Sequence, residues 1–69
     1  MSRTMLNIFR DMMTEIVESD SNKQVAFMDG KRDFVLVDEA KRFLKLTRNK
    51  QREAAMSHGS FMEAIRKID

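Results

Sequence analysis

The chain has 69 residues, no Cys and a net charge of +2 at pH 7. A chain this short forms one domain, residues 1–69, and buries only about 60% of its unfolded surface, so its core must be efficient or shared with a partner. The lack of Cys excludes disulfides and thiolate metal sites. No apolar run approaches the roughly 20 residues of a membrane span, and charges interrupt the N-terminal segment where a signal peptide would lie. We therefore expect a cytoplasmic protein with no membrane partner.

The charges are unevenly distributed along the chain. Residues 1–30 carry three cations and five acids, whereas residues 31–69 carry ten cations and six acids. This asymmetry allows an acidic half to face a basic half, within one fold or between two copies. It equally allows a basic face to meet a partner.

The N-terminal segment has the periodicity of an amphipathic helix from Thr4 to Glu18. The apolar residues at helical spacing are Met5, Ile8, Phe9, Met12, Met13, Ile16 and Val17. The acids on the flank of this helix are Asp11, Glu15 and Glu18. The polar cluster Ser19–Asn22 predicts a turn after the helix.

Two apolar runs, Gln24–Met28 and Asp33–Val37, flank an Asp29-Gly30 pair, which is a strong hairpin signal. A loop of two or of four residues places the same side chains together: Val25, Phe27, Phe34 and Leu36 on one face, and Ala26, Met28, Val35 and Val37 on the other. Both faces are then apolar, and three short helices leave one uncovered. Either the first and last helices sandwich the hairpin, or the protein forms a homodimer through the hairpin or the first helix.

A long helix is predicted after the hairpin, with Asp38 as its N-cap. The inner face of this helix contains Ala40, Phe43, Leu44, Thr47, Gln51, Ala54 and Ala55. Because the face is strongly apolar only as far as Leu46, we expect the middle of the helix to be partly exposed. Ser57-His58-Gly59 ends the helix, with Gly59 suited to a left-handed cap.

The segment Ser60–Glu63 has the pattern of a capping box and predicts a last short helix. The apolar residues of that helix are Met62, Ala64, Ile65 and Ile68. Together the elements predict a small α+β domain of the order α-β-β-α-α, with one antiparallel hairpin packed against helices.

The inventory of reactive side chains argues against an enzyme. His58 is the only histidine, and without Cys neither a His–Cys metal cluster nor a Cys–His nucleophilic pair can form. Ser57 and Ser60 flank His58, but residues so close on one turn rarely make the geometry of a Ser–His pair. We therefore expect a solvent-facing histidine, no catalytic residue, no metal and no cofactor.

A basic run without any carboxylate extends from Lys41 to Arg52. Its six cations are the candidate macromolecule-binding residues: Lys41, Arg42, Lys45, Arg48, Lys50 and Arg52. One continuous helix would stack four of them, at spacings of four, three and four, into a single stripe: Lys41, Lys45, Arg48 and Arg52. Like charges at this spacing cost a few tenths of a kcal/mol per pair, a cost that a bound anionic surface would offset.

The stripe has three interpretations. It can pair with Asp11, Glu15 and Glu18 of the first helix, although such surface pairs each contribute only about 0–1 kcal/mol. It can bind an acidic surface of another protein, where complementary charge speeds association. It can also bind a nucleic-acid backbone, whose counterions are released when cations contact the phosphates.

The segment Val37–Phe61 also resembles the helix-turn-helix of excisionases and similar small regulators. The residues that carry the resemblance are Asp38-Glu39-Ala40, Phe43-Leu44 and Leu46-Thr47-Arg48. It implies a short helix that ends near Lys45 and a recognition helix that starts after Thr47. Lys45 stands where the turn usually has Gly, and Gln51 and Arg52 stand where the recognition helix has buried apolar residues, so the resemblance assigns no residue a role.

We therefore expect a small non-catalytic regulator or inhibitor that binds another protein. The basic helix would supply charge, and the Met and Phe residues would supply an adaptable apolar surface, although the spacing of the methionines also suits core filling. Small size is typical of modulators, including those that viruses direct against host machinery. The alternative is a DNA- or RNA-binding transcriptional regulator that uses the same basic helix.

Overall fold

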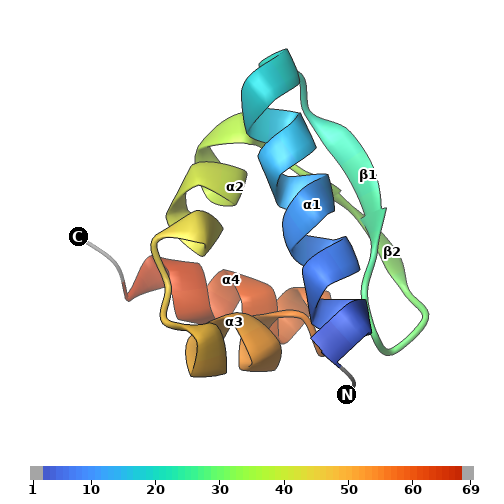
Figure 1. Ribbon diagram of the computed structural model, residues 1–69, viewed down its shortest axis with the longest axis vertical. Helices are drawn as coiled ribbons and strands as arrows, with labels where there is room; N and C mark the ends of the chain where they lie inside the picture. Colours follow the sequence, from blue (N-terminus) through green and yellow to red (C-terminus); the bar gives the residue numbers. More distant parts are fainter. Residues whose placement is uncertain (1–2, 68–69) are drawn as a thin grey trace.

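Four helices pack on one side of a two-stranded hairpin in the computed structural model, which describes residues 3–67 (Figure 1). The described elements are α1 (Arg3–Ser19), β1 (Lys23–Ala26), β2 (Arg32–Val35), α2 (Val37–Leu44), α3 (Arg48–Ala54) and α4 (His58–Arg66). The predicted α+β class, first helix and hairpin are confirmed, with one helix more than expected. Ile68, predicted in the last helix, lies outside the described residues.

The hairpin is antiparallel, and its loop has three residues. The strands pair so that Val25 lies opposite Asp33. The Gly30 amide donates to the Phe27 carbonyl (3.0 Å), and the Phe27 amide donates to the Lys31 carbonyl (2.8 Å). With Gly30 at φ +87°, this geometry is a type I turn followed by a glycine bulge.

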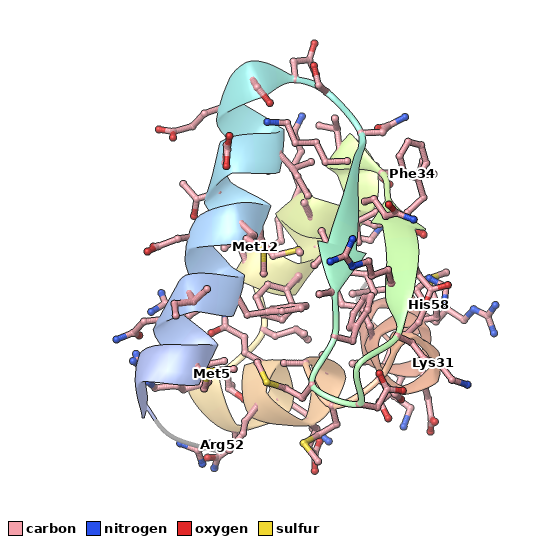
Figure 2. The ribbon with its side chains drawn as sticks, turned by 90° about the vertical axis from the view of Figure 1, so that its right-hand side faces the viewer. Met5, Met12, Lys31, Phe34, Arg52 and His58 are labelled. Atoms are coloured by element: carbon pink, nitrogen blue, oxygen red, sulfur yellow. The ribbon has the colours of Figure 1, made fainter. Side chains whose placement is uncertain are left out.

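This loop overturns the predicted faces of the hairpin. Loops of two or four residues keep the same side chains together, but a loop of three shifts the pairing by one residue and turns one strand over relative to the other. The buried face therefore contains Val25, Phe27 and Val35. Phe34 and Leu36, which were expected beside Val25 and Phe27, are instead 59% and 46% exposed, and Phe34 points away from the helices (Figure 2).

The buried face of α1 is centred further round the helix than the sequence pattern indicated. Leu6, which the pattern omitted, is 1% exposed, whereas Met5 and Ile8 are 44% and 49% exposed. The difference arises because α1 packs mainly against α2, while Phe9 of α1 also contacts Phe27 beside the hairpin. The rest of the predicted stripe is confirmed at Phe9 and Met13, which are fully buried.

The long helix predicted after the hairpin is in fact two helices. α2 ends at Leu44 and α3 begins at Arg48, with a turn at 45–47. Thr47 is the N-cap of α3, and its side-chain oxygen accepts a hydrogen bond from the Lys50 amide (3.3 Å). The break lies where the apolar inner face weakens and where the helix-turn-helix pattern places it.

The start of α2 also differs from the prediction. Leu36 is its N-cap, and the Leu36 amide donates to the Glu39 carboxylate (2.9 Å). The predicted cap, Asp38, lies in the first turn instead and pairs with Arg42 at 3.3 Å. Glu39, at the third position of the helix, therefore satisfies the backbone amide of the N-cap residue.

The start of α4 lies three residues earlier than predicted. Ser57 is its N-cap, and the Ser57 hydroxyl accepts a hydrogen bond from the Ser60 amide (3.1 Å). The predicted capping box at Ser60 is therefore wrong, and Gly59 lies in the first turn of α4 rather than in a left-handed cap. His58 is half-buried, with its ring centroid 5.6 Å from that of Phe27, so the expectation of a solvent-facing histidine is also wrong.

The two glycines predict opposite responses to alanine. Gly30 has φ +87°, where an L side chain is strained, whereas Gly59 is helical and has room for a Cβ, with the Ser57 hydroxyl oxygen 3.9 Å away. We expect Gly30→Ala to lower the free energy of unfolding by about 1–2 kcal/mol. We expect Gly59→Ala to raise it by up to about 1 kcal/mol, both measured by urea denaturation. A clear loss of stability in Gly59→Ala would contradict a helical conformation there.

Candidate macromolecule-binding surface

All six candidate cations are exposed, but they do not form one stripe. Lys41 and Arg42 lie on α2, Lys45 is the C-cap residue of α2, and Arg48, Lys50 and Arg52 lie on α3. Because a turn separates α2 from α3, the helical spacing does not stack the cations on one face. The predicted stripe on a continuous helix is therefore wrong, and the cations fall into smaller groups.

The acids of α1 do not neutralise these cations. Arg42 and Lys50 each pair at 3.3 Å with an acid of their own helix. Among the described residues, no ion pair joins the six cations to the acids of α1, and Glu15 pairs instead with Lys23 of β1 at 2.9 Å. The interpretation of the basic run as an internal partner of α1 finds no support in this part of the chain.

One group of cations lies on the flank of α3 beside α1. The Arg48 guanidinium donates to the Asn7 side-chain oxygen (3.1 Å). Arg52 lies one turn further along α3, at the same end of the molecule as Met5 (Figure 2). Arg10, one turn from Asn7 on α1, has a buried Nε with no acceptor among the described residues. This flank therefore presents guanidinium groups from two helices.

Lys45 and Lys50 lie instead at an open groove of about 720 Å³ between α3 and α4. Its apolar lining comes from Leu46, Met56 and Ala64. Leu46 and Ala64 are half-buried, whereas Met56 is 51% exposed. The groove thus places apolar side chains directly beside two of the candidate cations.

The charged residues of the groove are of both signs. Glu53 pairs with Lys50 (3.3 Å) and Glu63 pairs with Lys67 (3.6 Å), each pair within or at the end of one helix. Lys45 takes part in no ion pair among the described residues. Lys45 is therefore the lysine of the groove that has no carboxylate partner in this part of the chain.

The groove depends on how α3 is attached to the rest of the fold. α3 buries Ala54 and the 4% exposed Gln51, whose side-chain amide donates to the Phe43 carbonyl (3.3 Å). The hairpin tip holds the turn after α3, because the Met28 amide donates to the Ala55 carbonyl (2.9 Å). Gln51 thus occupies a buried position with a polar side chain that is satisfied by the backbone.

Sequence reasoning missed Met56, Ala64 and Lys67 as parts of this surface. Met56 follows α3 and Lys67 follows α4, so neither belongs to the basic run. Their proximity to Lys45 results from the packing of α3 against α4, which no local pattern encodes. The only signal was the weak apolar face after Leu46.

Neither a metal-binding cluster nor a membrane-spanning helix occurs in the described part of the chain. Among residues 3–67, no group of three or more His, Asp or Glu side chains could hold a metal ion. Within the same range, no helix has both the length and the apolar character needed to cross a bilayer. Comparison with protein-family models, curated proteins and solved structures finds no match to this chain.

The start of α3 gives a test of the helix break that separates the cations. Removing the Thr47 hydroxyl leaves the Lys50 amide without its cap, so we expect Thr47→Ala to lower the free energy of unfolding by about 1 kcal/mol. For a domain of this size the melting temperature should fall by about 4–8 °C. The control is Thr14→Ala, which removes a bond from the hydroxyl to the Arg10 carbonyl inside α1 (3.0 Å) and should cost nothing. Equal effects would contradict a cap at Thr47.

Proposed function

We propose that this protein is a small non-catalytic regulator or inhibitor that binds an acidic surface of another protein through the cations of α2 and α3. The observation that supports this most is the exposure of all six cations without any ion pair to the acids of α1. Exposed cations speed association with an acidic partner and orient it, even where they add little to affinity.

The surroundings of Lys45 and Lys50 favour a protein partner over a polyanion. Leu46 and Met56 supply apolar area next to these lysines, and apolar area is what a protein interface buries at its core. The carboxylates of Glu53 and Glu63 lie on the same groove, which therefore carries charges of both signs. A protein surface can place opposite charges against both the lysines and the carboxylates of the groove, whereas a nucleic-acid backbone carries only negative charge.

Nucleic-acid binding is the second candidate, and the helix break at 45–47 favours it. Two short helices joined by a turn have the layout of a helix-turn-helix, in which the start of the second helix contacts base edges. The exposed residues at the start of α3 include Arg48 and Asn49, whose side chains suit guanine and adenine. In this function α3 would enter the major groove of DNA.

Charge reversal tests the proposed function. We expect Lys45→Glu with Arg52→Glu to weaken partner binding at least about tenfold, because two cations without ion pairs become repulsive to an acidic surface. Binding is measured by capture from nuclease-treated lysate, then with the purified partner. The matched control is Lys31→Glu with Arg32→Glu, an equal charge change on the hairpin at two exposed residues that do not line the groove, which should bind like the unmodified protein; Lys31 lies on the other side of the view from Arg52 (Figure 2).

Two results would contradict a protein partner. The first is an equal loss of binding in the variant Lys45→Glu with Arg52→Glu and in the hairpin control, because the loss would then depend only on the net charge of the protein. The second is capture that nuclease abolishes. In that case the affinity for duplex DNA should fall with salt with a slope of about 0.9 per phosphate contact, as the second candidate requires.

Self-association is a separate prediction that rests on the outer face of the hairpin. Only Phe34 and Leu36 are prominently exposed there, fewer apolar residues than the sequence indicated. We expect sedimentation velocity at high micromolar concentration to show a dimer that Phe34→Ser converts to a monomer, because a buried Phe contributes about 2–3 kcal/mol. A strictly monomeric unmodified protein would contradict the prediction.

A further inference from the structure

The groove between α3 and α4 can contact a bound segment through side chains, but it has few free backbone groups to form hydrogen bonds with that segment. Half of its lining residues lie in α3 and α4, and the other half lie in the adjoining turns. In those turns the amides of Lys45, Leu46, Met56 and Lys67 already donate to carbonyls of the preceding helix, as amides inside a helix do. An extended segment laid against the apolar lining would bury amide and carbonyl groups without partners, at a cost of about 1–3 kcal/mol for each. A helix satisfies its own backbone, so a helical occupant fits this groove better.

The length of the groove limits the contact to about two helical turns. Along α4 its lining extends from Ser60 to Lys67. Seven residues of helix rise about 10 Å, which a partner helix covers with apolar anchors at positions i, i+3 or i+4, and i+7. The exposed Met56 side chain is flexible and can adapt to such anchors.

The charges of the groove select the sign of the occupant. Lys45 comes from the turn after α2, Lys50 from α3 and Lys67 from the end of α4. The two carboxylates of the groove already pair with Lys50 and Lys67, so Lys45 is the lysine of the groove that an occupant can pair with. A basic helix would meet this lysine with a like charge, whereas an acidic helix gains an opposite charge at the edge of an apolar contact.

We infer that this groove binds a short acidic amphipathic helix of the partner protein, with its apolar side against Leu46, Met56 and Ala64. The inference rests on the proposed function and identifies its contact site. Arg48 and Arg52, on the opposite flank of α3, lie outside this contact and steer the partner through longer-range attraction.

Selection from a random 12-residue peptide library displayed on phage tests the occupant. The unmodified protein is the target, and Ala64→Trp, which fills the groove, is the counter-target. We expect enriched peptides to combine Asp or Glu with apolar residues at helical spacing. In NMR spectra, a synthetic copy of the enriched sequence should shift the methyl signals of Leu46, Met56 and Ala64.

Binding of that synthetic peptide is then measured by fluorescence anisotropy. We expect Ala64→Trp and, separately, Met56→Glu to weaken it at least tenfold. Met56 is exposed, so this second variant changes the groove without touching the core. The matched control is Ala26→Trp, the same substitution at an exposed alanine of β1, which should leave the affinity unchanged.

Three results would overturn the groove inference: enriched peptides without acids, methyl shifts confined to the hairpin, or unchanged affinity in both groove variants. The proposed function is judged separately with the captured partner. If Lys45→Glu with Arg52→Glu loses that partner while Ala64→Trp and Met56→Glu retain it, the proposed function stands and the groove inference is wrong. If the peptide binds the groove but no protein partner is captured from nuclease-treated lysate, the proposed function is wrong.

Discussion

Mutual contact among four phenylalanine rings holds this small domain together. The rings are Phe9 of α1, Phe27 at the end of β1, Phe43 of α2 and Phe61 of α4. The centroid of Phe9 lies 5.3 Å from that of Phe27 and 5.2 Å from that of Phe43. Each buried ring contributes about 2–3 kcal/mol and each pair about 0.5–1.5 kcal/mol more, in a chain that has no disulfide to stabilise it. The positions of α1, the hairpin, α2 and α4 all depend on this cluster.

α3 is the helix that supplies no ring to the cluster, and its surface reflects this. Small side chains such as Ala54 and Ala55 let it approach closely, while its long cations stay in solvent. Its start is capped by the Thr47 hydroxyl, which accepts from the Lys50 amide, and the turn after it is held by the hairpin tip, where the Met28 amide donates to the Ala55 carbonyl. An element attached in this way leaves space along its neighbour, and the groove beside α4 is that space.

Local pattern was sufficient for the extent of α1, for the existence of the hairpin and for the burial of Phe43 and Ala54, but not for the buried face of α1. It was insufficient for the faces of the hairpin, because Asp29-Gly30 is compatible with loops of two, three and four residues, and only the odd loop exchanges the faces. It was also insufficient for the break after Leu44. The residues around the break are acceptable in a helix, and the broken form is supported by a contact between the two helices that no local pattern shows, the hydrogen bond from the Gln51 side-chain amide to the Phe43 carbonyl.

The break changes the argument for a binding surface. A continuous stripe would pay for repulsion among its cations, and that cost was itself a reason to expect a bound anion. In the folded protein the turn at 45–47 puts Arg48 and Arg52 on a different helix from Lys41, so the four cations do not share one helical face and this reason no longer applies to the whole stripe. Two observations therefore support a partner. The cations of α2 and α3 form no ion pair with the acids of α1, and they lie beside a groove with apolar lining that the side chains of the domain do not fill.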